Sequence, residues 1–177
     1  DPQASRLWSA RLAALPGRKI GINWHGNTRA EQLSALQARS FALEAVEPLT
    51  RVPGITLVSL QKGAGADQRE AVTFADRIVQ LTDPPHMGSV ELATETAAIL
   101  QGLDLVITAD TALAHLAGAL GVPVWLVLQS VADWRWLVDR TDTPWYPSMR
   151  LWRQQRAGDW LQVFEGIAQE LAIQPRS

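Results

Sequence analysis

The 177-residue sequence contains no cysteine, and this absence removes several kinds of chemistry. Disulfide frameworks, thiolate zinc sites and cysteine nucleophiles are all excluded. The sequence also lacks any apolar run close to the ~20 residues that a membrane-spanning helix requires. Its first segment mixes arginines with apolar residues at helical spacing, so it does not have the continuous hydrophobic core of a signal peptide. We therefore expect a cytoplasmic protein that is not an integral membrane protein.

The sequence also has no excess of positive charge. The chain has 16 Lys and Arg residues against 18 Asp and Glu residues, a formal net charge of −2. This balance provides no basic surface for a phosphate backbone, so we expect no nucleic-acid partner. Only two of the basic residues are lysines, which makes Lys62 conspicuous. An initiating Met is absent, and we expect the chain to be part of a longer polypeptide.

Short apolar segments alternate with helical patterns along the whole chain, which is typical of β-α units that build a parallel sheet. Strands are predicted at 19–24, 55–60, 77–81, 103–108, 122–128 and 149–153. Helices are predicted before Pro16 and at 41–50, 89–101, 111–120 and 159–172, with Ser40 and Asp159 as N-caps of the second and the last. We expect one α/β domain over residues 1–177, with a Rossmann-like, doubly wound parallel sheet. Ligands of such sheets bind beyond the carboxyl ends of the strands.

The strongest local signal is a buried strand that ends in Asp110-Thr111 and is followed at once by a helix of small residues. The first amides of a helix lack intrahelical partners and the helix dipole favours an anion, so a phosphate group would fit there. His115, four residues after Thr111, falls on the same face of the helix. The alternative is that Asp110 caps a packed helix and that His115 is a core histidine with its hydrogen bonds satisfied.

Two further loops follow predicted strands and would reach the same edge of the sheet. His25 and Asn27 come directly after the first strand, and Gln61 and Lys62 come directly after the second. A lysine in that position can neutralise negative charge on a leaving phosphate. A solvated polar loop and an exposed surface lysine are the alternatives for these residues.

Several segments together carry a family resemblance. They are Trp-His-Gly-Asn at 24–27, Gln-Lys-Gly at 61–63, Asp-Thr-x-x-x-His at 110–115, Pro-Val-Trp at 123–125, Asp-Trp-Arg-Trp at 133–136 and Pro-Trp-Tyr-Pro at 144–147. From about residue 19 to its end, the sequence resembles the C-terminal, nucleotide-sugar-binding domain of bacterial GT-B glycosyltransferases related to the family 9 heptosyltransferases. It is most similar to the branch in which tetratricopeptide repeats precede the glycosyltransferase module.

The resemblance implies roles for individual residues. Asp110, Thr111 and His115 would hold the diphosphate and ribose of the donor. His25 and Lys62 are the candidate catalytic residues. Asn27, Arg29 and Gln61 would contact the donor. In place of the family's Asp-Phe-Ala-Asp-Thr-Ala, residues 92–97 read Leu-Ala-Thr-Glu-Thr-Ala, where Glu95 keeps an acid and Thr96 is intact. Both are candidate donor-binding residues, and His86 is a further candidate for the nucleoside pocket.

The activity that the resemblance implies is transfer of a sugar from a nucleotide diphosphate sugar to an acceptor, with inversion, without a metal ion and without a separate cofactor. The sequence contains no Asp-x-Asp pair of the kind that holds a divalent ion in the other main glycosyltransferase fold. The acceptor and the catalytic base are expected on an N-terminal domain outside this chain. A nucleotide-sugar epimerase of the same architecture and a non-catalytic nucleotide-binding module of a tetratricopeptide protein are the alternatives.

Four tryptophans leave a further choice open. Trp134, Trp136, Trp145 and Trp152 could form a platform on which a sugar ring stacks, or they could pin an irregular loop to the core. The second interpretation is favoured for Trp145 and Trp152.

Overall fold

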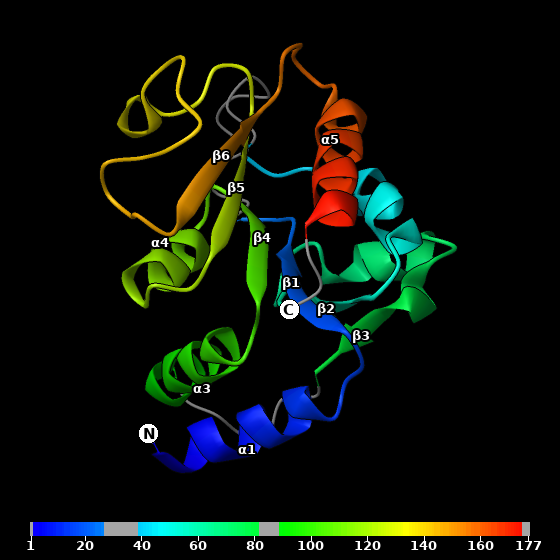
Figure 1. Cartoon of the computed structure of the whole chain (residues 1–177), viewed down its shortest axis with the longest axis vertical. Helices are drawn as coiled ribbons and strands as arrows, with labels where there is room; N and C mark the ends of the chain where they lie inside the picture. Colours follow the sequence, from blue (N-terminus) through cyan, green and yellow to red (C-terminus); the bar gives the residue numbers. More distant parts are fainter. Residues whose placement is uncertain (1, 27–38, 82–88, 175–177) are drawn as a thin grey trace.

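The computed structural model describes residues 2–26, 39–81 and 89–174. In these ranges the strands are β1 (Arg18–Asn23), β2 (Ile55–Ser59), β3 (Ile78–Gln80), β4 (Leu105–Ala109), β5 (Val124–Leu128) and β6 (Met149–Arg153). They form one sheet with the order β3-β2-β1-β4-β5-β6, and every neighbouring pair is parallel (Figure 1). This is the strand order of the Rossmann fold, so the predicted fold class is confirmed.

Helices cover both faces of the sheet. The α-helices are α1 (Pro2–Ala13), α3 (Ser89–Gln101), α4 (Ala112–Ala119) and α5 (Trp160–Ile173), and the short 3₁₀ helices are η2 (Leu43–Arg51), η3 (Ala66–Ala71), η4 (Ala75–Arg77) and η5 (Trp134–Trp136). Helices α1, α3 and α4 lie on one face, whereas α5 and η2 pack together on the other (Figure 1). None of the helices in the described ranges combines the length and the apolar character that a membrane span needs.

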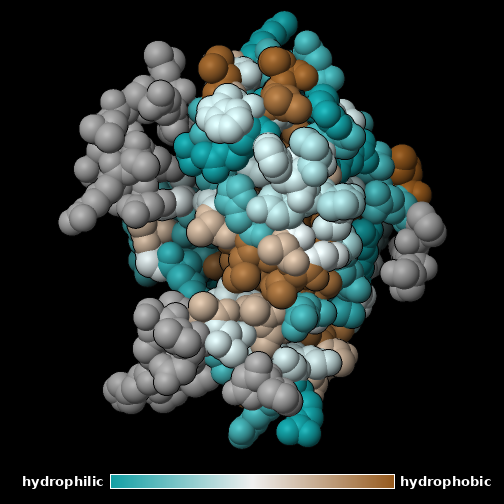
Figure 2. Space-filling view, turned by 90° about the vertical axis from the view of Figure 1, so that its left-hand side faces the viewer, coloured by the Kyte–Doolittle hydropathy of each residue, from teal (hydrophilic) through white to brown (hydrophobic). Residues whose placement is uncertain are grey.

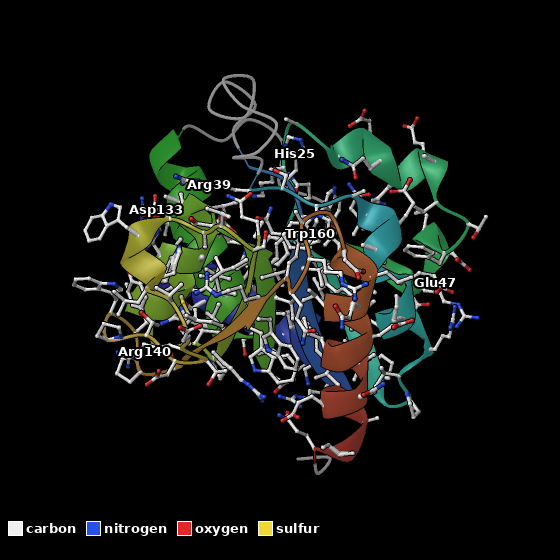
Figure 3. All side chains as sticks on the ribbon, turned by 90° about the horizontal axis from the view of Figure 1, so that it is seen from above. His25, Arg39, Glu47, Asp133, Arg140 and Trp160 are labelled. Carbon is white, nitrogen blue, oxygen red and sulfur yellow. The ribbon has the colours of Figure 1, made fainter. Side chains whose placement is uncertain are left out.

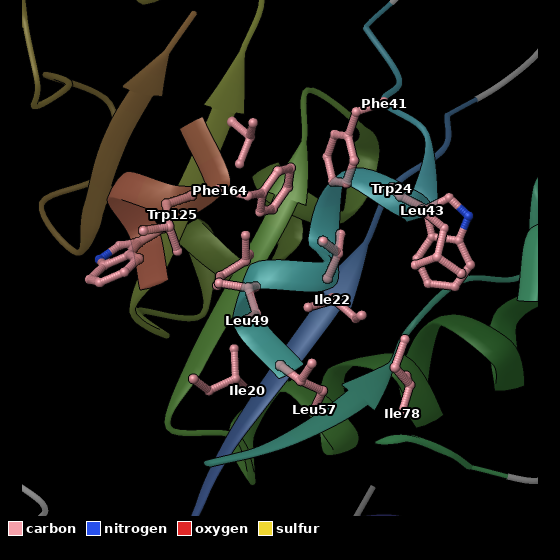
Figure 4. Close-up of a cluster of buried hydrophobic side chains, with 14 of the residues drawn as sticks. Ile20, Ile22, Trp24, Phe41, Leu43, Leu49, Leu57, Ile78, Trp125 and Phe164 are labelled. Atoms are coloured by element: carbon pink, nitrogen blue, oxygen red, sulfur yellow. The ribbon is translucent and has the colours of Figure 1, made fainter. Parts of the chain in front are cut away.

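The central strands are apolar on both sides because both faces of the sheet are covered. Every residue of β4 and β5 is buried. Alternate side chains of a strand point to opposite faces, and in β4 Leu105 and Ile107 join the core under α5, whereas Val106 joins the core under α3 and α4. Figure 4 shows the first of these cores, in which Phe41 and Phe164 bring η2 and α5 together over the sheet, with ring centroids 4.8 Å apart. Continuous apolar runs of this kind are expected in a parallel sheet.

Helix starts were predicted with mixed success. Asp159 caps α5 as expected, because its carboxylate accepts a hydrogen bond from the backbone N–H of Gln162. The prediction for Ser40 was wrong. The segment after it forms the 3₁₀ helix η2, which contains Pro48 and begins after Ala42 without a side-chain cap. Proline cannot supply the N–H that an α-helix interior requires. The Ser40 hydroxyl instead accepts a hydrogen bond from the N–H of Gly26.

Candidate functional site

The order of the strands reverses between β1 and β4, and polar side chains lie at the carboxyl ends of both strands. Asn23, the last residue of β1, is 6% exposed, and Thr108 in β4 is fully buried. The hydroxyls of Thr108 and Thr111 donate to Oδ1 of Asn23 at 3.1 and 3.2 Å. Sequence reasoning did not select Asn23 or Thr108. The available signal was a polar residue at the end of an otherwise apolar strand, at the place where ligands of such sheets bind.

Gln61 extends this hydrogen-bonded group to the end of β2. Its Oε1 accepts from Nδ2 of Asn23 at 2.8 Å and from the backbone N–H groups of Trp24 and His25 at 3.1 and 2.9 Å. Its Nε2 donates to the carbonyls of His25 and Ala64 at 3.1 and 2.7 Å. The side-chain amide of Gln61 therefore joins the loop after β1 to the loop after β2.

His25 is placed by this loop contact. Gly65 has φ +79°, and a Cβ atom there would lie 2.6 Å from Cβ of His25, so only glycine lets the two loops approach this closely. The indole N–H of Trp24 donates to the carbonyl of Gly65 at 2.8 Å. Nδ1 of His25 lies 2.8 Å from the carbonyl oxygen of Gly26. Figure 3, which looks onto the carboxyl ends of the strands, shows His25 at this edge of the sheet.

Helix α4 begins directly after β4 and carries the strongest sequence motif. Thr111 is its N-cap residue, but the Thr111 hydroxyl makes no capping bond and donates to Asn23 instead. Asp110 does not cap the helix either. It is 6% exposed, and its Oδ1 is buried with no hydrogen-bond partner among the described residues. A buried carboxylate oxygen without a partner is costly and points to a missing hydrogen-bond donor.

The structure places His115 near Asp110, whereas the helical spacing predicted a shared face with Thr111. Nε2 of His115 lies 3.9 Å from Oδ1 of Asp110 and 3.4 Å from a guanidinium nitrogen of Arg135. Nδ1 of His115 lies 3.0 Å from the hydroxyl of Tyr146. The imidazole also stacks on the indole of Trp136, with ring centroids 5.5 Å apart and planes inclined by 19°.

Two arginines that sequence reasoning did not select surround Asp110. Arg39 lies 3.7 Å from Oδ2 of Asp110 and 3.2 Å from Oδ2 of Asp133, and Figure 3 shows Arg39 beside Asp133. Arg135 makes a two-pronged ion pair with Asp133, with both N–O distances 2.9 Å. The hydrogen bond from Arg135 lowers the pKa of Asp133, and burial opposes this shift. The two arginines thus place two cations beside two carboxylates close to the start of α4.

A cavity of about 240 Å³ lies beyond the ends of β2 and β3 and brings three predicted residues together. It is lined by Gln61, Lys62 and Thr96, together with Ser59, Leu60, Gly63, Ala66, Gln80, Leu81 and Ile99. Glu95 does not line it. The carboxylate of Glu95 accepts a hydrogen bond from the indole N–H of Trp8 in α1. The predicted candidates Asn27, Arg29 and His86 lie outside the described residues.

The four tryptophans differ in exposure, which sequence reasoning could not show. Trp136 is 1% exposed and Trp134 is 79% exposed. Trp145 is 56% exposed, yet its indole N–H donates to the carbonyl of Arg135 at 2.8 Å, so it fastens the loop between β5 and β6. Trp152 packs on Trp125 with ring centroids 5.2 Å apart. Figure 2 shows the face with α4 and this loop, where hydrophobic side chains reach the surface among hydrophilic ones.

Part of the chain matches a known family of enzymes. Residues 62–127 match the model of glycosyltransferase family 9 (heptosyltransferase). The matched range begins at Lys62 and includes Thr96, Asp110 and His115, but it ends before the Pro-Trp-Tyr-Pro segment.

Longer proteins resemble nearly the whole chain. Protein FlbA of Caulobacter vibrioides is 32% identical over 175 residues, which are 97% of this chain and 28% of that protein. The Escherichia coli ADP-heptose LPS heptosyltransferase II matches in structure with a TM-score of 0.61 and 15% identity, over 97% of this chain and 52% of that one. The E. coli heptosyltransferase WaaC, solved with ADP-2-deoxy-2-fluoro heptose, matches with a TM-score of 0.52 and 18% identity, over 94% and 45%. The structural matches show a shared fold, and the family match supports a glycosyltransferase domain.

Proposed function

We propose that this chain is the donor-binding half of a GT-B glycosyltransferase and that it holds a nucleotide diphosphate sugar where α4 begins. The observation that carries the proposal is Asp110, a buried carboxylate at the switch point between β1 and β4, one oxygen of which has no partner among the residues that the structure describes. Switch points are where ligands of this fold bind. The family 9 match over residues 62–127 supports sugar transfer as the reaction class.

The charges around Asp110 decide which part of the donor it contacts. A carboxylate repels a diphosphate, but Arg39 lies 3.7 Å from Oδ2 and compensates that oxygen. Oδ1 remains as an acceptor and needs a neutral donor. We assign it to a hydroxyl of the ribose or of the transferred sugar. The phosphates then lie on the first amides of α4, near Thr111, with Arg39 and Arg135 as nearby cations.

The nucleoside is assigned to the cavity lined by Gln61, Lys62 and Thr96. Thr96 contributes a polar group there, whereas Glu95 holds α1 through Trp8 and acts indirectly. Lys62 lies in the loop that follows β2. Its ammonium group stabilises the negative charge on the diphosphate leaving group during sugar transfer. His25 and Asn27 are assigned to the phosphates and the sugar, with the His25 backbone fixed by Gln61.

Inversion without a metal ion is the proposed mechanism. Cationic side chains and helix amides then stabilise the charge that develops on the leaving diphosphate, a role that a bound divalent ion plays in other enzymes. The acceptor and the catalytic base are assigned to a domain outside this chain, because the chain spans 52% of the E. coli heptosyltransferase II and 28% of FlbA. Activity of the longer protein is expected to survive a chelator, and loss that magnesium or manganese restores would contradict this part.

Calorimetric titration of the chain tests the donor site. ADP-, UDP-, GDP- and dTDP-sugars and the corresponding free diphosphates should be compared, beginning with ADP-sugars because WaaC was solved with one. We expect one of these nucleotides to bind, and we expect Asp110→Asn to weaken it while Asp142→Asn, which alters an exposed surface ion pair, does not. A folded sample that binds none of them at millimolar concentration would refute the proposal. Product analysis with the longer protein separates transfer, which consumes an acceptor, from epimerisation and from a non-catalytic module.

A further inference from the structure

Tyr146, the only tyrosine of the chain, contacts helix α4 through His115. It belongs to the Pro-Trp-Tyr-Pro segment that precedes β6, beyond the range that the family model matches. Its hydroxyl lies 3.0 Å from Nδ1 of His115, and the two rings meet edge to face with centroids 5.8 Å apart. Nδ1 of the imidazole is therefore hydrogen-bonded to a residue 31 positions away in the sequence.

The position of Tyr146 depends on a glycine in α4. Gly118 is buried, and a Cβ atom there would lie 2.6 Å from Cγ of Tyr146 and 2.8 Å from Cδ1. Real Cβ contacts are never this short, so any other residue at 118 would force the tyrosine ring to move. Gly118 is three residues after His115, on the same side of the helix. The absence of a side chain at Gly118 thus leaves space for the ring of Tyr146, whose hydroxyl contacts His115.

The second nitrogen of His115 faces the charged side chains of the site. Nε2 lies 3.4 Å from Arg135 and 3.9 Å from Asp110, so the guanidinium is the nearer group. A guanidinium can only donate hydrogen bonds, and it therefore pairs with a ring nitrogen that carries a lone pair. The proton of the neutral imidazole then sits on Nδ1 and is donated to the hydroxyl oxygen of Tyr146. Stacking on Trp136 holds the plane of the ring.

We propose that Tyr146, seated on Gly118, is a positioning residue that fixes the ring and the tautomer of His115 beside the donor site. The proposal rests on the proposed function for the part that concerns nucleotide binding. Its consequence is that His115 presents an acceptor, not a donor, toward Asp110 and Arg135. His115 then serves by orienting Arg135, whose cation faces the diphosphate. This role extends the site to a loop that follows β5.

The decisive variant is Tyr146→Phe, because it removes only the hydroxyl and keeps the ring on Gly118. Nitrogen chemical shifts of ¹⁵N-labelled histidine, recorded without nucleotide, report the tautomer of His115 directly. We expect the Nδ1–H form in the original chain and a mixture of tautomers in the variant. Affinity for the nucleotide sugar should fall roughly three- to tenfold, as expected for the loss of one hydrogen bond that orders a site.

Two further variants separate positioning from loop stability. Trp145→Phe removes the bond to the Arg135 carbonyl from the same segment but leaves His115 untouched, and it should keep the tautomer unchanged. Gly118→Ala should displace Tyr146 and change the histidine spectrum like Tyr146→Phe, although alanine favours the helix itself.

The outcomes are distinguishable. An Nε2–H tautomer in the original chain, or a histidine spectrum that Tyr146→Phe does not change, would overturn the positioning role. An altered spectrum with unchanged nucleotide affinity would overturn its link to the donor site. If the original chain binds no nucleotide, the proposed function fails, while the nucleotide-free spectra still decide whether Tyr146 sets the ring of His115.

Discussion

Two groups of polar side chains lie at the same edge of the sheet but are built differently. The neutral cluster consists of Asn23, Gln61, Thr108 and Thr111, and its members hydrogen-bond to one another at the ends of β1, β2 and β4. The charged cluster consists of Arg39, Asp110, His115, Asp133 and Arg135 at the start of α4 and in the segments around it. Figure 3 shows Arg39 and Asp133 at this edge.

The contrast between the clusters lies in how completely their hydrogen bonds are satisfied. Oε1 of Gln61 accepts three bonds, and Oδ1 of Asn23 accepts two. In the charged cluster, Oδ1 of Asp110 is buried without a hydrogen-bond partner in the described part of the chain. The other carboxylate oxygen, Oδ2, lies 3.7 Å from Arg39. A satisfied buried network makes a structure rigid, whereas an unsatisfied group stores a cost that a ligand can relieve. We infer that the neutral cluster holds the strand ends in place and that the charged cluster binds the nucleotide sugar.

The largest expected effect tests whether the buried Trp136 supports the charged cluster by packing against His115. Trp136 is 1% exposed and stacks under His115, so Trp136→Ala should lower the free energy of unfolding by roughly 3–5 kcal/mol. Trp134→Ala is the matched control, because Trp134 is 79% exposed and its loss should change stability by no more than about 0.5 kcal/mol. Denaturant unfolding measures both values. Equal losses in the two variants would mean that Trp136 does not support the cluster in this way.

The alternation of short apolar runs with helical patterns was enough to predict a parallel sheet, and the reason is physical. Strands covered on both faces must be apolar throughout, so β4 and β5 stand out from the helices around them. The strand-to-helix turn at Asp110 and Thr111 is also a local feature, and the structure has α4 begin there, with His115 3.9 Å from Asp110.

Contacts between distant segments could not be predicted. Arg39 and Asp133 are 94 positions apart, and Trp8 and Glu95 are 87 positions apart, so no local pattern links them. Glu95 was selected for its acid, yet its carboxylate is used by α1. Gln61 was selected as a ligand contact, yet its amide is taken up by backbone groups. Residue type alone does not show which polar groups the fold itself will use.

The next effect tests recognition by Asp110. Asp110→Asn keeps the shape of the side chain but removes the charge, and hydrogen bonds to charged groups contribute about 1.5–3 kcal/mol. Nucleotide-sugar affinity should therefore fall by roughly ten- to a hundredfold by calorimetry. The melting temperature should stay the same or rise, because the variant no longer buries an unpartnered carboxylate oxygen. A lower melting temperature with unchanged affinity would show that Asp110 is structural.

The neutral cluster should respond in the opposite way. Asn23→Ala removes the acceptor for two threonine hydroxyls and a donor to Gln61, and it should cost about 1–3 kcal/mol of unfolding free energy. Thr108→Val is the control, because it keeps the shape and removes one hydroxyl, and it should cost about 1 kcal/mol. Affinity per folded molecule should change little in Thr108→Val. A strong loss of affinity with full stability in Asn23→Ala would make the neutral cluster a ligand contact.

The smallest effect concerns pH and the ion pair that supports the charged cluster. The hydrogen bond from Arg135 lowers the pKa of Asp133 below its ordinary value of 3.8. A carboxyl whose pKa is lower in the folded state binds fewer protons there than in the unfolded chain, so its contribution is fully present above the unfolded value and is lost as pH falls through the folded value. The contribution should therefore begin to fall near pH 4, be lost at lower pH and amount to roughly 1 kcal/mol or less, because both partners remain partly exposed. Unfolding curves recorded from neutral pH down to about pH 2 should show a shallower acid limb in Asp133→Asn than in the original chain.

Arg140 and Asp142 form a similar two-pronged pair, but Asp142 is 71% exposed, so Asp142→Asn should leave the acid limb almost unchanged. Identical acid limbs in Asp133→Asn and the original chain would mean that the pair adds no stability, and that Arg135 is held beside His115 by packing alone.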